Sequence, residues 1–316
     1  ILVDTRIASD LAGAGEITVL TRQDQVVGGA AAALGGGAGG TFAGSFVVNV
    51  ADGSAITTLH DSALLADTIS ATSIGGADLV ANAGAVAVGA TGAVGLAIGA
   101  NVARQTIRTD IDATYMLAQG PVILTADVEG ALSGAGIAAA VDGTVGITGT
   151  GLGNSALNTV ELLVRDTTDP TPAGVRKGSQ IYTAGSVLMG AEARNTIQLK
   201  GGSEDDPGLS ISFAAGGAAG VGASATVNTL RNDVRVAVSG NTRVTGLGHS
   251  GVTRDGAERF GVVIDASAGA TISMLTANGA VGGIAGVAAL MSLNLIEDDA
   301  RVQLGTGAPG AQGWIN

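Results

Sequence analysis

The sequence contains no cysteine, and its 316 residues include only one tryptophan, two tyrosines and four phenylalanines. Without cysteine no disulfide can stabilise the fold, and the absence is compatible with a chain that is exported unfolded. A compact core of this size normally uses aromatic side chains to fill its volume. Their scarcity therefore predicts thin layers held together by small side chains, and an elongated shape.

Basic residues and proline are also scarce. Lysine occurs only at Lys177 and Lys200, and the formal net charge is −12. An acidic chain lacks the basic surface that nucleic-acid binding requires, so we expect no nucleic-acid partner. Glycine is abundant, at 53 residues, but the five prolines and the lack of a three-residue period exclude collagen.

What the chain does contain is an internal repeat, in which an asparagine follows a Gly/Ala-rich run. In four of five copies an arginine stands seven residues after that asparagine, whereas the first copy has Ile56 there. The anchors are Asn49, Asn101, Asn158, Asn228 and Asn294, and the arginines are Arg108, Arg165, Arg235 and Arg301. We expect the arginines to point outward in one row, neutralised by Asp110, Asp166, Asp233 and Asp299.

The anchors lie between 52 and 70 residues apart, which indicates that loops have been inserted into some copies. The polar stretches 165–180 and 200–210 hold the extra length, and their Pro, Gly and Asp clusters are typical of surface turns. The chain begins "ILVDTRIASD", with neither an initiator methionine nor a signal peptide. We therefore expect one continuous unit, residues 1–316, belonging to a longer repeat array.

Between the anchors lie short β-branched runs such as "TRVTGL" and "FGVVIDASA", which are typical of strands, and helix signals are poor. Repeated strands without interleaved helices predict an all-β fold, a parallel β-helix (β-solenoid) built from degenerate repeats of about 52–70 residues. At roughly 20–25 residues per coil, each repeat would make two or three coils, in a rod about 60–75 Å long. The asparagine would occupy a corner of each coil.

Four long stretches carry no charge: Val26–Ala51, Leu79–Ala103, Gly208–Leu230 and Ala266–Ile296. They are long enough for spanning helices, but they are rich in Gly, Ala, Ser, Thr and Asn, and acidic residues flank them. We therefore expect no membrane-spanning segment here. Because neither face of these runs is polar, we expect both faces to be covered, by another layer of the same chain or by another copy.

The repeated pattern "AGGAAGVGASATVNTLRND" resembles the repeat regions of very large bacterial surface proteins, the filamentous haemagglutinin-like and leukotoxin-type adhesins with β-solenoid passengers. The resemblance covers essentially the whole chain through its repeats. It implies export to the bacterial cell surface, a rod-like stalk in the extracellular space, and an adhesive or structural role with no catalytic residues. The partners would be other copies of the chain or a ligand on a host or neighbouring cell.

Residues able to support chemistry are few. His60 and His249 are the only histidines, and without a nucleophile motif around them we expect solvent-exposed turn residues. The acidic run Glu204, Asp205 and Asp206 could bind calcium, but it lacks the spacing of known calcium loops, so we expect a solvated loop and no cofactor.

The alternative function is a β-helix enzyme acting on extracellular polysaccharide. Such an enzyme needs paired carboxylates and aromatic platforms for sugar rings. Asp166 with Asp169, or Glu297 with Asp298, could supply the carboxylates, although neither pair has an aromatic neighbour in the sequence. A repeated row of arginines fits a structural role better than a single catalytic site, so the adhesive or structural fibre is our main expectation and we predict no enzymatic activity.

Overall fold

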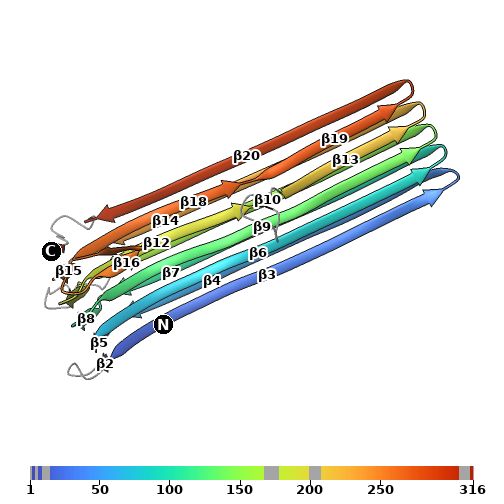
Figure 1. The fold of residues 1–316 in the computed structure, drawn as a ribbon. Helices are drawn as coiled ribbons and strands as arrows, with labels where there is room; N and C mark the ends of the chain where they lie inside the picture. The colour runs from blue at the N-terminus through green and yellow to red at the C-terminus, as the bar shows by residue number, and fades with distance from the viewer. Residues whose placement is uncertain are drawn as a thin grey trace.

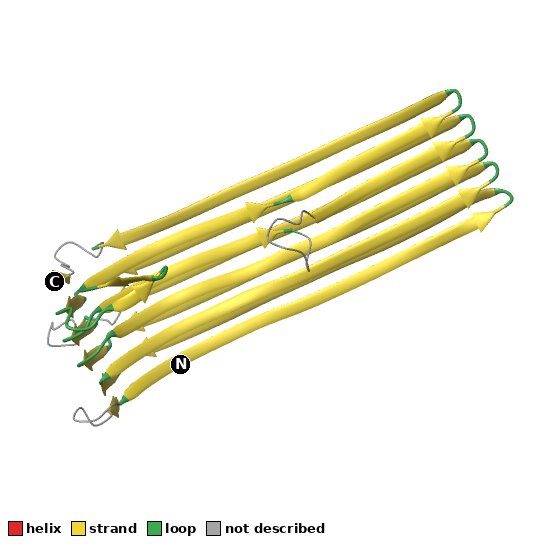
Figure 2. Ribbon diagram, in the orientation of Figure 1, coloured by secondary structure: helices red, strands yellow, loops and turns green. Residues whose placement is uncertain are grey.

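The structure is a computed structural model that describes residues 2–3, 6–8, 15–166, 178–198, 208–305 and 314–315. It is a parallel β-helix with a flattened cross-section, in which two sheets of very long strands pack face to face (Figures 1 and 2). The described ranges contain strands and turns but no helix. The expected all-β solenoid is therefore confirmed.

Each coil consists of a long strand, a tight turn, a second long strand that returns, and a short third strand. Sheet 1 contains β1 (Leu2–Val3), β4 (Gly40–His60), β7 (Gly92–Asp112), β10 (Val145–Arg165), β14 (Ala219–Val238) and β20 (Ala285–Leu304). Sheet 2 contains β3 (Glu16–Gly37), β6 (Thr68–Gly89), β9 (Val122–Asp142), β12 (Val187–Ile197), β13 (Gly208–Gly216), β18 (Val262–Ile272) and β19 (Met274–Gly282).

Sheet 3 is short and lies at the end opposite the tight turns. It contains β2 (Arg6–Ala8), β5 (Ala63–Ala66), β8 (Tyr115–Ala118), β11 (Gln180–Thr183), β15 (Arg243–Gly246) and β21 (Trp314–Ile315). All pairings within these three sheets are parallel, as stacking of successive coils requires. One antiparallel hairpin, β16 (Val252–Arg254) with β17 (Ala257–Arg259), is inserted before β18.

One repeat makes one coil, so the expectation of two or three coils per repeat was wrong. Asn49 in β4 is in register with Asn101 in β7, the next strand of sheet 1, and these residues are 52 positions apart. A strand of about 21 residues is about 70 Å long, whereas stacked coils rise only about 4.8 Å each. The long dimension in Figure 1 therefore runs along the strands. We had expected it to run along the stacking axis.

The core changes character along the strands. Near sheet 3 it contains large aliphatic side chains, among them Leu59, Ile107 and Met116, which are fully buried. Towards the tight turns it is built almost entirely from alanine, including Ala85, Ala97 and Ala140. Small side chains let the two sheets approach closely, which explains how the fold is filled with so few aromatic residues.

A row of asparagines crosses the middle of sheet 1, and all but the last of them, Asn294 in the edge strand β20, are buried. Its members are in register and face the opposite sheet, and each donates from Nδ2 to Oδ1 of the next, at 2.7–2.9 Å: Asn49, Asn101, Asn154, Asn228 and Asn294. Asn158, which the sequence analysis takes as the third anchor, lies four residues further on and pairs with Asn232. The third anchor was therefore misplaced, and Asn154 is the equivalent residue.

We had expected the asparagines to occupy corners of the coils, but they lie inside the strands of sheet 1. The corners after sheet 1 are made by Asp61, Ala113 and Gly240, whose φ angles are 47°, 48° and 72°. At Gly240 a Cβ would lie 2.8 Å from the Cβ of Asp166, so glycine suits this corner both by conformation and by space.

Candidate binding surface

The outer face of sheet 1 is apolar over its half nearest the tight turns. Outward-facing residues in register form rows across β4, β7, β10, β14 and β20. Two of these rows are Phe42, Val94, Ile147, Val221 and Val287, and then Phe46, Ile98, Gly151, Ala225 and Met291. The next two are Val48, Ala100, Gly153, Val227 and Leu293, and then Val50, Val102, Ser155, Thr229 and Leu295.

The outer face of sheet 2 is apolar over the same half. Its rows include Ala32, Gly84, Ile137, Ile211 and Ala277, and then Leu34, Val86, Ala139, Phe213 and Gly279. This exposure is not confined to the first and last coils, because Leu96, Ile137 and Ile147 in the inner coils are 37–46% exposed. We call this half the apolar end: residues 25–51, 79–103, 130–156, 208–230 and 266–296.

The apolar end stops abruptly at one level of the strands. The next outward row of sheet 1 is Asp52, Arg104, Leu157, Arg231 and Glu297, where Arg104 lies 3.9 Å from Asp52 and Arg231 lies 3.8 Å from Glu297. On sheet 2 the charges begin at Asp24, Asp78 and Glu129. Within the apolar end the single charged residue is Asp142, which ends β9 at the tight turn.

A shallow hollow of about 380 Å³ lies on the apolar end over sheet 1. Leu96 and Ile98 form one side of it and Met291 another, while Gly149, Gly151 and Ala225 lie between them. Because these small residues are in register between larger ones, the hollow is a consequence of side-chain size within two rows. Its lining is almost entirely apolar.

We had expected both faces of the Gly/Ala runs to be covered. The inner face is covered, because Ala81, Ala85 and Ala97 pack between the two sheets. The outer face is not covered by any part of the chain that the structure describes, as the exposed Ile137 and Val141 show. The expectation is therefore confirmed for the inner face. For the outer face, covering by another copy of the chain stays a prediction.

The arginines do not form the single row that the sequence predicts. Arg108, Arg235 and Arg301 share one register row, but Glu161 and not Arg165 occupies that row in β10. Arg165 lies four residues further along, in register with Asp112. This is the same four-residue displacement as at Asn158, because that anchor determined the position of the arginine.

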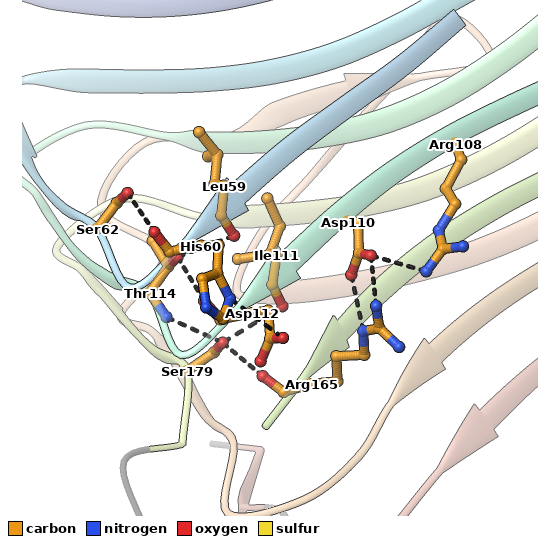
Figure 3. Close-up of polar contacts among 10 residues, drawn as sticks. All are labelled: Leu59, His60, Ser62, Arg108, Asp110, Ile111, Asp112, Thr114, Arg165 and Ser179. Carbon is orange, nitrogen blue, oxygen red and sulfur yellow. Dashed lines mark hydrogen bonds and ion pairs between the residues drawn. The ribbon is translucent and has the colours of Figure 1, made fainter. Parts of the chain in front are cut away.

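The acids near the arginines do form ion pairs. Asp110 accepts from Arg108 at 2.7 Å and from both Nε and Nη2 of Arg165 at 2.9 and 2.6 Å (Figure 3). Asp233 and Asp299 both accept from Arg301, at 3.0 and 2.9 Å. Glu161 in the row also separates Arg108 from Arg235, which reduces repulsion between like charges.

His60 lies in a polar corner at the start of sheet 3 (Figure 3). Its Nδ1 is 3.3 Å from the Asp112 carboxylate, and the Ser62 hydroxyl donates to the His60 backbone carbonyl and not to the ring. Thr114 and Ser179 donate to backbone carbonyls of neighbouring coils. These hydrogen bonds hold the corner together and do not form a nucleophile–histidine pair. His249 is exposed in a loop, as expected.

A buried arginine that sequence reasoning missed lies over the outer face of sheet 2. Arg254, on the β16–β17 hairpin, is 3.0 Å from Asp265, 3.3 Å from Glu192 and 3.7 Å from Asp127. Gly190 makes room for it, since a Cβ there would lie 3.3 Å from the guanidinium carbon. Only the acidic residues at 127, 192 and 265 could have signalled this cluster, and they are far apart in the sequence.

This cluster changes the titration of Asp127. Burial raises the pKa of Asp127 from 3.8 to about 6, Arg254 opposes the rise, and the nearby Glu192 carboxylate adds to it. The Asp127 side chain remains one-third exposed. The arrangement fastens the inserted hairpin to the solenoid.

The remaining candidates give no assembled site. Glu204, Asp205, Asp206 and Asp169 lie outside the described residues. Glu297 and Asp298 face opposite sides of β20, because Glu297 lies near Arg231 on the outer face while Asp298 accepts from Asn232 on the inner face. Among the described residues there is no cluster of three or more histidine or acidic side chains arranged to hold a metal ion.

An aromatic pair on sheet 3 also escaped the sequence analysis. The rings of Tyr115 and Tyr182 have centroids 6.2 Å apart, and the guanidinium of Arg243 lies 5.7 Å from the Tyr182 ring centroid. The three residues come from successive coils, β8, β11 and β15. The sequence gives no sign of this contact because each residue is isolated along the chain.

Comparison with known proteins adds no assignment, since no family model, curated protein or solved structure matches the chain. Within the described residues no helix has the length and apolar character needed to cross a membrane. The apolar end is therefore the feature on which a functional argument can be based.

Proposed function

We propose that this chain is a structural and adhesive segment of an extracellular bacterial surface fibre, in which stacked coils form the scaffold and the apolar end forms the contact surface. The observation that carries the proposal is the apolar end itself, whose outward rows are in register through five coils on sheet 1. Soluble monomers rarely expose such continuous apolar areas unless they bind something there.

The size of this surface supports a binding role. An area five strands wide and eight residues long covers roughly 600 Å² on the outer face of each long sheet. Each further coil of the same kind would add another strip. A weak contact made by one coil is therefore multiplied along the array, as in other multivalent surfaces.

The cell-surface location is supported by the resemblance of the repeats to those of large bacterial adhesins and by the lack of cysteine. The partner in this proposal is a surface on a neighbouring or host cell, or another copy of the chain. The proposal gives no residue a catalytic role. The buried asparagine ladder stabilises the scaffold.

An attachment assay tests the proposal. Beads coated with the chain should adhere to cells and to alkyl-coated glass, and Leu96→Arg should reduce adhesion because it places a charge in the apolar rows. Thr106→Arg is the matched control, since Thr106 is exposed on the same face of β7 but lies beyond the charged row. Equal adhesion by both variants, or none by the unmodified chain, would contradict the proposal.

A further inference from the structure

We propose that the outer face of sheet 1 binds the same face of a second copy of the chain, related to the first by a two-fold axis that runs parallel to the strands between β7 and β10. This inference rests on the proposed role of the apolar end as a contact surface, and it names the partner of the sheet 1 half. Because β4, β7, β10 and β14 are consecutive in the sheet, β7 would face β10 of the second copy and β4 would face β14.

Sheet 1 is the better of the two long faces for such a contact. Its strands β4, β7, β10, β14 and β20 each run uninterrupted through the apolar end, whereas sheet 2 is interrupted between β12 and β13 and again between β18 and β19. The strands of sheet 1 also run almost parallel to one another (Figure 1). Sheets that pack face to face keep their strands roughly aligned, so two such faces can stay in contact over many residues.

Large side chains face small ones in this register. A two-fold axis parallel to the strands places each level of one sheet opposite the same level of the other, and every contact is made twice. Leu96 on β7 therefore faces Gly149 of the second copy. Ile98, at the next outward position, faces Gly151. These two glycines line the hollow of about 380 Å³, so the side chains of each copy fill the hollow of the other.

Phe46 adds to this fit from the neighbouring strand β4. Its side chain is 66% exposed, although aromatic residues are scarce in this chain. The residue opposite it in the second copy is Ala225 on β14, which lies at the same level and lines the same hollow. An aromatic side chain placed in a pocket is a common anchor of protein interfaces. The self-complementary shape therefore extends over two pairs of strands.

The charged row that borders the apolar end is complementary in the same register. Asp52 on β4 faces Arg231 on β14 of the second copy, and by symmetry the pair forms twice. Arg104 on β7 faces the uncharged Leu157. The side chains of Asp52 and Arg231 are 62% and 57% exposed, so both are accessible to a partner. Within one copy β7 and β10 separate these two residues.

Moving the axis by half a strand spacing removes the charge complementarity. With the axis on β10, Asp52 would face Glu297 and Arg104 would face Arg231. With the axis on β7, Arg104 and Leu96 would each face the same residue of the second copy. Like charges that meet across an interface are strongly unfavourable, so both of these registers are disfavoured.

Other orientations lose the fit of side-chain sizes or the charge pairs. With the axis between β10 and β14, Ile98 would face Met291 while Gly151 faced Ala225, so large side chains would collide and small ones would leave a gap. A two-fold axis across the strands, centred on the hollow, would turn the charged row towards the tight turns of the second copy. The axis between β7 and β10 satisfies both size and charge.

The contact is large enough for a stable dimer. The overlap of β4, β7, β10 and β14 from the level of Phe42 to that of Asp52 covers about 700 Å² of each copy, which is about 1,400 Å² in all. Specific protein interfaces bury about 1,200–2,000 Å² in total. The contact uses the faces of the sheets alone and leaves their edges free.

Filling the hollow tests the fit without adding charge. Gly151→Val should weaken self-association at least about tenfold in sedimentation velocity, because the new side chain occupies the space that Ile98 of the second copy needs. Within one copy a Cβ at 151 would contact only Ile98, at 3.7–3.8 Å, so the strand accepts it. Gly28→Val is the matched control, since Gly28 is exposed on the outer face of sheet 2 and a Cβ there would meet nothing within 4 Å. It should leave association unchanged.

Charge reversal tests the register by rescue. Asp52→Arg and Arg231→Asp should each weaken self-association at least about tenfold, because each places like charges opposite one another twice in the dimer. An equimolar mixture of the two variants should associate as the unmodified chain does, since the mixed dimer contains two pairs of opposite charge. Asp24→Arg, on the outer face of sheet 2, should have no effect. Circular dichroism of each variant would confirm that the β-structure is retained, and rescue by mixing excludes misfolding independently.

Adhesion of coated beads separates this inference from the proposed function. Gly151→Val keeps the face apolar, so it should still adhere to cells and to alkyl-coated glass while losing self-association. If the unmodified chain is monomeric but adheres, the paired arrangement is wrong and the adhesive function stands. If it associates and no variant weakens the association, or if mixing restores nothing, the copies meet elsewhere and the inference is wrong. If it neither associates nor adheres, both proposals fail.

Discussion

Asn101 donates from its Nδ2 to Oδ1 of Asn154, 53 residues later, at 2.9 Å, and accepts through its own Oδ1 from Asn49 at the same distance. Asn101 Nδ2 also donates to the backbone carbonyl oxygen of Ser133 in the opposite sheet, with 2.7 Å between nitrogen and oxygen. One buried side chain therefore connects three coils of sheet 1 and also joins sheet 1 to sheet 2.

Removing this side chain should destabilise the fold. We expect Asn101→Ala to lower the free energy of unfolding by about 2–3 kcal/mol, because it leaves buried hydrogen-bonding groups without partners and opens a small cavity. Urea denaturation would measure the change. Thr106→Ala, an exposed position in the same strand, should change stability by less than about 0.5 kcal/mol. Equal effects of the two substitutions would show that the ladder contributes little.

Glycines in the alanine core should differ according to the space around them. At Gly95 a Cβ would lie 2.7 Å from the backbone oxygen of Ala139, whereas at Gly92 nothing lies within 4 Å. We therefore expect Gly95→Ala to cost about 1–3 kcal/mol and Gly92→Ala to be tolerated. Gly286→Ala should resemble Gly95→Ala, since its Cβ would lie 2.8 Å from the Ala280 oxygen. Thermal unfolding would compare the three, and tolerance at all of them would contradict close sheet packing.

The two kinds of arginine pair should also differ. The Asp110 side chain is 7% exposed and receives hydrogen bonds from Arg108 and Arg165, whereas Asp299 is 57% exposed and binds Arg301 alone. We expect Asp110→Ala to cost about 1–3 kcal/mol and Asp299→Ala less than about 1 kcal/mol. Denaturation at high salt should reduce the second effect more than the first. A reversed order would mean that burial does not determine the strength of these pairs.

The Arg254 cluster should make stability depend on pH. Because the pKa of Asp127 is raised in the folded state to about 6, the folded state holds this proton more tightly than the unfolded state. Its contribution to stability is fully present below about pH 4 and is lost as the pH rises through about 6. Asp127→Asn should flatten the stability profile between these values, measured by denaturant unfolding, and an unchanged profile would exclude the group as its source.

The hairpin itself supplies a further test. Arg254→Met leaves Glu192, Asp265 and Asp127 facing one another without their common cation. Breaking a buried pair from one side is costly, so we expect the β16–β17 hairpin to detach. Its amides should then exchange with solvent much faster while those of β9 change little. Arg259→Met is the control, because Arg259 is exposed on the same hairpin. Unchanged exchange in Arg254→Met would show that other contacts hold the hairpin.

The repeat and the strand class could be predicted because they depend on composition and local spacing. The number of coils could not, since Gly/Ala-rich runs do not show where one strand ends and the next begins. The alternation of inward and outward residues, which normally reveals a strand, is hidden where both are apolar, as in residues 83–100. The chain therefore forms strands of about 21 residues where several shorter ones had been expected.

The misplaced third anchor has a simple physical origin. Asn154 and Asn158 both face inward and both join asparagine ladders, since residues four apart lie on the same side of a strand. Arg165 happens to lie seven residues after the wrong one. Register is determined by pairing with β7 and β14, which the sequence of one copy cannot reveal.

The candidate surface was only half visible in the sequence. Missing charges in 79–103 and 266–296 indicate an unusual environment, and the flanking acids mark its limits. That the charges of Asp52, Arg104, Arg231 and Glu297 meet in one row depends on register between distant copies. The Arg254 cluster and the tyrosine pair depend on the same long-range pairing.

The in-register stacking of the asparagines also determines how such a chain grows. Each coil uses at least 52 residues, yet it advances the stack by only about 4.8 Å. A chain of a thousand residues folded in this way would therefore reach less than about 100 Å, while remaining about 70 Å broad. Added sequence therefore lengthens the stack slowly, because each further coil adds a strip of sheet about 70 Å long but only about 4.8 Å wide.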